Sequence, residues 1–372
     1  MRFIHTGDLH LGKRVHEQSM LDEQREALAF ITDTAKRERA DALVIAGDVY
    51  DRSVPPVEAV ELFDDFITEL ESAGIAVVAV PGNHDSAERV GYGGRILGKH
   101  GVYVSGEYDG TLARARIGCA DFWLLPFVRP AVVAKATGKT CADFDECVRA
   151  ALSGAEFSPG RRNVLVAHQF VTAAGVSPLR SDSETVSVGG VDNVDVSAFD
   201  AFDYVALGHI HGPQSVGRGT VRYAGSPLYY SFSECPQTKS IALVELNETG
   251  DPEVRLIPMK LGRRLHEIRC TLADMKKAAA ERGIPADSYM HVTLTDEDEI
   301  INAIDKVREV FPNTLLLDFD NARRNYSGGT SPASVNEKSA EELFSDFYEM
   351  QCGAPLSAEQ TALLREVTEV GE

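Results

Sequence analysis

Five apolar segments of strand length each run into residues with metal-binding side chains, and this pattern restricts the fold more than any other feature of the chain. The central segment is residues 42–46, which is followed by Gly47 and Asp48. The other four lead into Asp8 and His10, Asn83-His84-Asp85, His168, and His209-Ile210-His211. Because the carboxyl ends of parallel strands lie along one edge of an α/β sheet, where ligands bind, we expect these side chains to meet at a single site.

The segments between these strands have the periodicity of helices. Apolar residues recur at helical spacing in residues 20–31 and 57–70, and two prolines precede the second stretch, where proline suits a first turn. Strand and helix alternate over the first 80 residues, which indicates a parallel sheet with helices on its faces. Two candidate hairpins, 214–224 and 240–260, predict a second, mostly antiparallel sheet. The expected fold class is therefore α/β, in the form of an α+β sandwich: a two-sheet core with flanking helices.

A domain boundary is expected near Gly262. Residues 1–260 form the predicted core domain, and residues 263–325 have the pattern of a small α/β domain in the order strand, helix, strand, helix, strand. Residues 326–338 have the Gly- and Ser-containing composition of a linker. Residues 339–372 predict a C-terminal helix-loop-helix. These two helices are too short to bury their apolar faces on each other, so they bind either a partner or the core of this chain.

The net charge of −20 is unlike that of a simple nucleic-acid binder, which normally has a basic patch. Residues 331–372 hold −7 of this charge and the remainder of the chain −13, of which two divalent cations would offset four. The charge does not decide between substrates, but it indicates that a partner supplies part of any DNA-binding surface.

Compartment is predicted from three features. The six cysteines have no C-x-x-C spacing, no apolar run reaches the length of a membrane span, and a strand begins directly after Met1-Arg2. We therefore expect a cytoplasmic protein with reduced thiols, no membrane segment and no signal peptide.

The polar residues at the strand ends form a donor set for divalent cations, which bind deprotonated carboxylates, neutral imidazoles and amide oxygens. The predicted ligands are Asp8, His10, Asp48, Asn83, His168, His209 and His211. The many imidazoles favour Mn²⁺, with Mg²⁺, Fe and Zn²⁺ as alternatives. Two ions about 3.5–4 Å apart would clamp a phosphate and lower the pKa of a bridging water. We expect Asp48 to bridge the two ions.

His84 and Asp85 are the predicted catalytic residues. His84 adjoins the ligand Asn83, and Asp85 is beside it to orient a ring nitrogen. The imidazole would stabilise the transition state or protonate the leaving oxygen. The alternative is a structural His84–Asp85 pair. Four basic residues near the motifs are interpreted as solvated loop charges and lie outside the predicted site: Lys13, Arg14, Arg52 and Arg89.

The strand-end motifs resemble, in order, the five motifs of the calcineurin-like metallophosphoesterase superfamily. More narrowly, the chain resembles the SbcD family, the nuclease subunits of bacterial SbcC–SbcD complexes. This narrower resemblance is carried by Val49-Tyr50-Asp51 with Pro55-Pro56 and by the stretch 223–234. In addition, the small α/β domain is similar to the capping domain of that family, and the C-terminal helices are similar to its partner-binding tail.

The resemblance implies a ligand assignment and an activity. Asp8, His10, Asp48 and His211 would hold one metal, and Asp48, Asn83, His168 and His209 the other, with His84 as the catalytic imidazole. The implied activity is Mn²⁺-dependent cleavage of DNA phosphodiesters in repair, recombination and replication. It comprises a 3′–5′ exonuclease on double-stranded ends and an endonuclease on single strands or hairpins.

The resemblance also implies partners. The SMC-like ATPase SbcC would bind the C-terminal helices, in a heterotetramer with two copies of each subunit. The nuclease would form a homodimer through helices near the site, here residues 59–70 and 90–97. Asp51 is a departure from the archaeal and eukaryotic relatives, which have histidine there, although bacterial members resemble this chain.

Two other functions compete with a nuclease. A phosphatase or small-molecule phosphodiesterase of the same superfamily would suit the acidic composition and the sequence from Gly47 to Arg52, but would not need the extra domain and the apolar tail. A scaffold without activity is the second alternative, and the complete set of ligands argues against it.

Overall fold

The computed structural model describes residues 1–138, 140–184, 192–260, 262–320, 340–352 and 354–369. It divides into two compact units, Met1–Arg264 and Leu265–Glu372. The predicted linker, residues 326–338, lies outside the described residues.

The first unit is built on two six-stranded sheets. In the first sheet the strand order is β16-β15-β1-β4-β5-β6; β1, β4, β5 and β6 are parallel, and β15 and β16 form an antiparallel hairpin beside β1. The bounds are β1 Arg2–Thr6, β4 Ala42–Ala46, β5 Ala76–Val80, β6 Val102–Val104, β15 Ser240–Glu245 and β16 Glu253–Pro258. The predicted hairpin at 240–260 is confirmed, but it belongs to this sheet.

The second sheet has the order β13-β14-β12-β9-β8-β7. Its four central strands are parallel and only the edge strands β13 and β7 run antiparallel, so the prediction of a mostly antiparallel sheet is wrong. The chain passes from β8 to β9 through two helices, the crossover that a parallel pair requires. The bounds are β7 Ala113–Ile117, β8 Ala120–Leu125, β9 Arg162–His168, β12 Tyr204–Gly208, β13 Gln214–Val216 and β14 Arg218–Tyr223.

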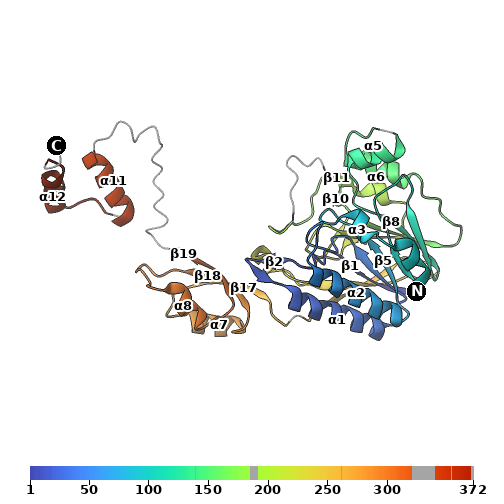
Figure 1. Ribbon diagram of the computed structural model, residues 1–372, viewed down its shortest axis with the longest axis horizontal. Helices are drawn as coiled ribbons and strands as arrows, with labels where there is room; N and C mark the ends of the chain where they lie inside the picture. Colours follow the sequence, from blue (N-terminus) through green and yellow to red (C-terminus); the bar gives the residue numbers. More distant parts are fainter. Residues whose placement is uncertain (139, 185–191, 261, 321–339, 353, 370–372) are drawn as a thin grey trace. The chain divides into compact units, whose positions relative to one another are not determined.

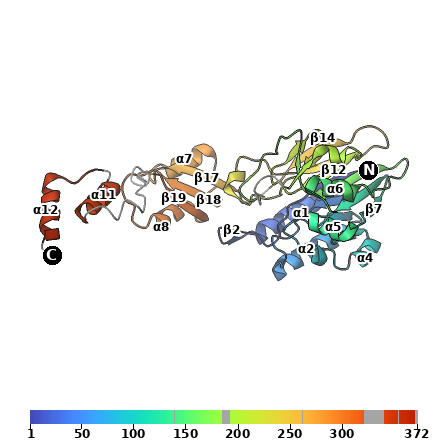
Figure 2. The same ribbon diagram turned by 90° about the horizontal axis from the view of Figure 1, so that it is seen from above.

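Helices cover the outer face of each sheet, so this unit has four layers (Figure 1). Helices α1 (Leu21–Glu38) and α2 (Val57–Ser72) lie side by side on the first sheet (Figures 1 and 2), as the periodicity predicts. Helices α5 (Pro130–Thr137) and α6 (Phe144–Leu152) pack on the second sheet. The predicted sandwich of two sheets with flanking helices is confirmed.

A third apolar layer lies between the two sheets and explains why the strand runs are continuously apolar. In β1, Ile4 faces the α1–α2 layer, whereas Phe3 faces the second sheet. Phe3 packs edge to face on Phe122 and Tyr204, with ring centroids 5.3 and 5.5 Å apart. Because successive side chains of a strand point to opposite faces, a strand buried on both faces needs apolar residues at every position.

Shorter elements occupy the loops of the first unit. They are α3 Ala87–Val90, α4 Gly94–Leu97, the 3₁₀ turns Gly98–His100, Val196–Phe199 and Phe232–Glu234, and the two-stranded pairs β2 Arg14–Val15 with β3 Gln18–Ser19 and β10 Phe170–Thr172 with β11 Asn193–Asp195.

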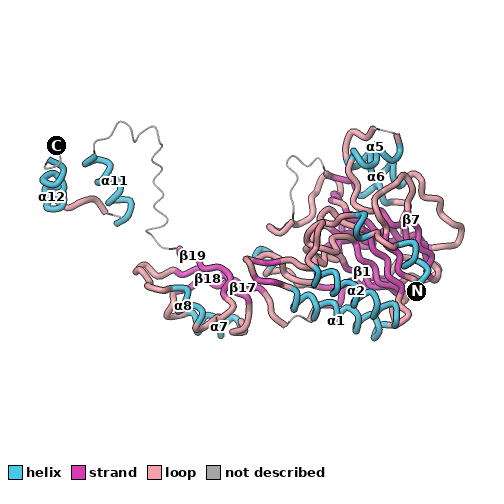
Figure 3. Tube along the Cα trace, viewed as in Figure 1, coloured by secondary structure: helices cyan, strands magenta, loops and turns pink. Residues whose placement is uncertain are grey.

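The second unit contains a three-stranded parallel sheet in sequential order, β17 Leu265–Cys270, β18 Tyr289–Leu294 and β19 Thr314–Phe319. Helices α7 (Met275–Arg282) and α8 (Ala303–Arg308) share one apolar cluster with these strands (Figure 3). The predicted order of strands and helices is confirmed here.

Two further helices end the described chain, α11 Ala340–Cys352 and α12 Ala358–Glu369. Ser357 caps α12: its hydroxyl accepts a hydrogen bond from the Gln360 N–H at 3.3 Å, and the Gln360 side chain accepts one from the Ser357 N–H at 2.8 Å. Phe344, Phe347 and Leu363 are exposed on these helices.

Two expectations about the whole chain can be checked on the described residues. The side chains of five cysteines are described, and all five are free thiols. None of the helices that the structure describes combines the length and the apolar character needed to cross a bilayer.

Candidate metal centre

Four of the predicted ligands follow their strands in a backbone conformation with positive φ, which residues other than glycine rarely adopt. Asp8, His10, Asp48 and His209 have φ values of 51°, 44°, 47° and 105°. Such conformations cost about 1–3 kcal/mol each and persist where the surroundings enforce them, typically at functional sites. Here two loops support each other, because the Asp8 N–H donates to the Gly47 carbonyl at 3.0 Å and the His10 N–H to the Asp48 carbonyl at 2.9 Å.

Glycines next to the ligands allow the strand ends to approach closely. A Cβ atom on Gly47 would lie 2.2 Å from Nδ1 of His168, and one on Gly82 would lie 2.1 Å from a carboxylate oxygen of Asp48. Gly47 also has a φ of +86°, which side chains rarely tolerate. The two glycines therefore leave the space into which His168 and Asp48 fit.

One group of predicted ligands comes from the ends of β1, β4 and β12. His10 Nε2 lies 3.1 Å from His211 Nε2 and 3.6 Å from a carboxylate oxygen of Asp48. Ligand atoms of Asp8, His10 and His211 lie within 4.8 Å of one another, and all three residues are buried. The structure thus brings Asp8, His10, Asp48 and His211 together.

A second group forms on the other side of Asp48. The side-chain oxygen of Asn83 lies 2.9 Å from Nε2 of His168 and 3.1 Å from Nδ1 of His209. His168 Nε2 is also 3.4 Å from the Asp48 carboxylate. All seven predicted ligands therefore lie in one cluster. Asp48 lies between the two groups, and Asp8 also reaches the second group, 3.7 Å from His168 Nδ1 and accepting the His209 N–H at 2.8 Å.

His84 lies next to the first group but is oriented by a residue other than the predicted one. Its Nδ1 is 3.0 Å from the carbonyl oxygen of Asp51, and its ring packs edge to face on His10 with 4.8 Å between centroids. The Asp85 carboxylate instead accepts hydrogen bonds from the N–H groups of Val49, Tyr50 and Gly82 at 2.9–3.0 Å. Asp85 thus fixes the turn after Asp48, and the prediction that it orients the His84 ring is corrected.

A buried network that the sequence did not reveal surrounds His211. The Ser183 hydroxyl and the Glu234 carboxylate lie 2.7 and 3.3 Å from His211 Nδ1, and the Lys239 ammonium donates to the His211 carbonyl at 3.0 Å. Glu234 and Lys239 form an ion pair at 2.5 Å. This network directs Nε2 of His211 towards the centre. Glu234 belongs to the stretch 223–234, which carries part of the family resemblance. The sequence pattern does not indicate that Glu234 would contact His211.

Burial and crowding of charges shift the pKa values of these groups. Burial raises the pKa of Asp8 to about 7, and burial together with the Asp48 charge raises that of Asp85 to about 6. Burial alone would lower the pKa of His168, but the Asp48 carboxylate raises it to about 9. For Asp48 burial acts upwards, yet the neighbouring histidines, His168 first, hold its pKa well below the usual range. Without cations the centre therefore retains protons near neutral pH.

The donor set fits divalent cations. Oδ2 of Asp8 is buried without a hydrogen-bond partner among the described residues. An unsatisfied buried polar atom is costly unless something else satisfies it. Carboxylate, amide oxygen and imidazole donors on both sides of one shared carboxylate suit a pair of ions such as Mn²⁺ or Mg²⁺. The centre thus supports divalent metals.

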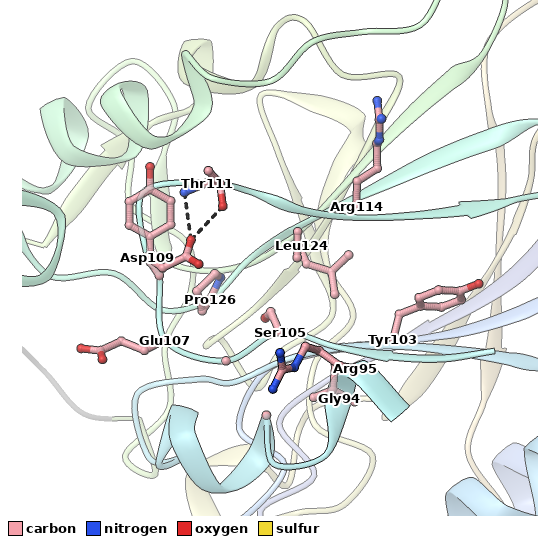
Figure 4. A pocket seen from close by; sticks show the side chains of 15 residues that line it. Gly94, Arg95, Tyr103, Ser105, Glu107, Asp109, Thr111, Arg114, Leu124 and Pro126 are labelled. Carbon is pink, nitrogen blue, oxygen red and sulfur yellow. Dashed lines mark hydrogen bonds between the residues drawn. The ribbon is translucent and has the colours of Figure 1, made fainter. Parts of the chain in front are cut away.

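A cavity of about 390 Å³ lies elsewhere in the first unit, between the edge strands β6 and β7. Arg95, Tyr103, Ser105 and Arg114 are among its lining residues (Figure 4). None of the lining residues is a predicted ligand, so this cavity is not part of the metal centre.

Comparison with known families and proteins gives consistent matches. Residues 1–213 match the calcineurin-like phosphoesterase family, and residues 261–351 match the type 5 capsule protein repressor C-terminal domain. The SbcD subunit of the nuclease SbcCD from Staphylococcus epidermidis is 28% identical over 97% of this chain and 96% of its own length. The protein of the same name from Staphylococcus saprophyticus subsp. saprophyticus is 29% identical over 99% of this chain and 97% of its own.

Solved structures similar to this chain include a dimetal phosphatase from Danio rerio. It is 15% identical and covers 70% of this chain and 99% of its own, with a TM-score of 0.37. GAP50 of Plasmodium is 12% identical and covers 70% of this chain and 85% of its own, with a TM-score of 0.43.

Raising the pH is expected to destabilise the metal-free protein. Above pH 7 this effect comes from His168, whose pKa is raised to about 9, so the folded chain holds a proton that the unfolded chain has released, and stability falls as the pH rises towards 9. Below pH 7 the raised pKa values of Asp8 and Asp85, about 7 and 6, act in the same direction, but the lowered pKa values of His5, His10 and His209 oppose them. Metal binding needs the deprotonated ligands, so its stabilising effect should grow over the same range.

Thermal melts from pH 7 to pH 9 check this expectation. In EDTA the melting temperature should fall by about 5 °C, and the difference between Mn²⁺-loaded and metal-free protein should widen with pH. A melting temperature in EDTA that rises over this range would contradict the assignment.

Proposed function

The chain belongs to the calcineurin-like phosphoesterase family, and from this premise we propose that it is the Mn²⁺-dependent DNA nuclease subunit of an ATP-dependent end-processing complex. The family match and the nuclease names of its relatives identify it as a metal-dependent phosphodiester hydrolase. The proposed reactions are 3′–5′ exonucleolytic cleavage of double-stranded ends and endonucleolytic cleavage of single strands or hairpins, in repair and recombination.

The observation that carries this proposal is the position of Asp48 between two groups of ligands. His10 and His168 lie 3.6 and 3.4 Å from its carboxylate on the two sides. We assign Asp8, His10, Asp48 and His211 to one ion, and Asp48, Asn83, His168 and His209 to the other. Two ions held in this way supply Lewis-acid polarisation of the phosphate and lower the pKa of water. The imidazole-rich set favours Mn²⁺ over Mg²⁺.

His84 is the proposed catalytic imidazole, and Asp85 is a positioning residue. Nδ1 of the ring donates to the Asp51 carbonyl at 3.0 Å, and we propose Nε2 as the nitrogen that exchanges a proton. The backbone N–H of His84 also donates to the Asp48 carboxylate at 2.9 Å, which holds the backbone of His84 next to the shared carboxylate. From this position His84 would stabilise the phosphorane-like transition state or protonate the leaving oxygen.

The proposed partners follow from the relatives and from exposed apolar residues. We assign residues 1–260 to the nuclease domain, 263–325 to a capping domain, 326–338 to a linker and 339–372 to binding of the ATPase SbcC. Exposed Phe344, Phe347 and Leu363 support the last assignment. The proposed assembly has two copies of each protein and acts on DNA in the cytoplasm.

Contact between the two nuclease copies is proposed through residues 59–70 and 90–97. Val57, Tyr92 and Ile96, in or beside these segments, are 68%, 86% and 67% exposed. Apolar side chains this exposed support an interface at this face.

Replacing His84 with alanine is expected to lower turnover of duplex DNA by about 10²–10⁴-fold, the usual contribution of a general acid or base. Metal content should stay unchanged, because no ligand is removed. His100→Ala, which removes a mostly exposed imidazole, is the matched control. The measurement is kcat with Mn²⁺ and end-labelled duplex DNA, together with metal analysis of both variants.

Substrate choice tests the nuclease proposal in the same assay. The wild-type chain should cleave duplex DNA and a generic phosphodiester but not a phosphoserine peptide. Preference for the peptide would favour a phosphatase, and unchanged turnover in His84→Ala would remove this residue from the mechanism.

Truncation after Gly329 is expected to abolish binding of the ATPase, because it removes α11 and α12. Hydrolysis of a small phosphodiester should remain within about twofold, since the metal centre is built entirely from the first unit. Pull-down by the ATPase and a colorimetric assay check the two effects. Phe344→Ala/Phe347→Ala serves as the companion variant; loss of the fold on truncation would instead favour helices that cover the chain's own core.

A further inference from the structure

Two arginines of the first unit stack on phenylalanine rings close to the metal centre. The Arg180 guanidinium carbon is 3.8 Å from the centroid of the Phe170 ring, and that of Arg129 is 5.6 Å from the centroid of the Phe127 ring. Both distances are within the range of cation–π attraction. The two phenylalanines come from different places, one from β10 and the other from the turn after β8.

Each phenylalanine contacts one of the proposed metal ligands. The ring centroids of Phe127 and His168 are 6.2 Å apart, and those of Phe170 and His209 are also 6.2 Å apart. The two imidazoles contact each other with 5.3 Å between centroids. All three contacts are edge to face, with interplanar angles of 72–84°. A continuous row results, with an arginine at each end and the two histidines in the middle: Arg129, Phe127, His168, His209, Phe170 and Arg180.

The backbone near Arg180 is fixed by hydrogen bonds on both sides. Leu179 exchanges two hydrogen bonds with the Gln214 side chain, at 2.9 and 2.8 Å. Ser181 donates to the carboxylate of Glu184, which in turn accepts from the His211 N–H at 2.8 Å. Arg180 thus lies between two anchored residues, and its side chain is exposed.

The other end of the row is anchored as well. The Phe127 N–H donates to the Pro81 carbonyl at 3.0 Å, immediately before the turn that carries Asn83. Arg129 directly precedes α5, and its carbonyl accepts hydrogen bonds from Val132 and Val133 at 2.9 and 3.2 Å. Both arginines therefore project from ordered backbone next to the ligands.

Within the described part of the chain, neither of these two guanidinium groups has a carboxylate partner. Lys13 and Arg52, on the other side of the centre, pair instead with Asp51 at 2.7 and 3.5 Å. Stacking uses the face of a guanidinium and leaves its N–H edge available, and this edge matches a phosphate.

We propose that Arg129 and Arg180 bind backbone phosphates of a nucleic-acid strand on either side of the scissile phosphate. This inference rests on the proposed nuclease function and adds a strand-positioning role for two residues that hold no metal. Contacts to backbone phosphates fix the register of a strand without reading its bases. The row would therefore position any sequence across the His168–His209 side of the centre.

The test compares a substrate that has flanking phosphates with one that has none. Arg129→Ala, Arg180→Ala and the double variant are made in the full chain, with Arg255→Ala, an exposed arginine paired with Glu38, as the control. KM for a single-stranded oligonucleotide and kcat/KM for bis(p-nitrophenyl) phosphate are measured with Mn²⁺. Binding of a fluorescein-labelled oligonucleotide is measured by anisotropy in EDTA over a range of salt concentrations.

Each single substitution should raise KM and Kd for the oligonucleotide about five- to tenfold and lower the slope of log K against log salt by about 0.7. Hydrolysis of the small diester should stay within about twofold. Arg180→Lys should keep the salt slope but recover only part of the affinity, because lysine retains the charge without the stacked plane.

If the wild type and the arginine variants all cleave DNA, with the same KM and the same salt slope, this inference is overturned and the nuclease proposal stands. Equal losses on both substrates would also overturn it, because the arginines would then support the centre itself. A wild-type chain that hydrolyses the diester but neither binds nor cleaves DNA would overturn the nuclease proposal, and this inference with it.

Discussion

The carboxylate of Asp48 is the constraint on which the centre depends. It is buried between two groups of ligands, 3.6 Å from His10 on one side and 3.4 Å from His168 on the other. It stays ionised although burial opposes this, because the surrounding imidazoles hold its pKa down. A buried charge of this kind is stable only with compensating charges. Two divalent cations would provide that compensation, and phosphodiester hydrolysis in the proposed function would use the same cations.

The rest of the fold keeps Asp48 in a backbone conformation that it would not adopt alone. Four parallel strands of the first sheet and the parallel centre of the second bring their carboxyl ends to one edge. Asp85 then ties the turn after β4 to the turn after β5 by three backbone hydrogen bonds. On the other side, the buried pair of Glu234 and Lys239 holds the loop of His211. Strain at the predicted ligands is therefore offset by polar groups outside the ligand set.

The sequence predicts the strand ends well and the second layer of contacts poorly. Apolar runs that end in glycine and a polar residue predict that these seven side chains cluster, and the structure brings them together, because strand direction and the φ of Gly47 leave few other arrangements. The pattern of apolar residues indicates which strands are buried but not in which direction each strand runs. It therefore does not predict that the central strands of the second sheet are parallel. Sequence adjacency pairs Asp85 with the neighbouring ring, yet its partners include the turn at Val49 and Tyr50, which tertiary packing brings close. Arg129 and Arg180 lie 51 residues apart and share no pattern that would pair them.

The most direct test of this account is the number of metal ions that each chain holds. Wild-type protein and Asp48→Asn protein with the same circular dichroism spectrum would be equilibrated with Mn²⁺, desalted and analysed by native mass spectrometry. The account predicts two ions in the wild type and fewer than two in the variant, because the shared carboxylate belongs to both sites. One ion in each protein, or two in each, would contradict it.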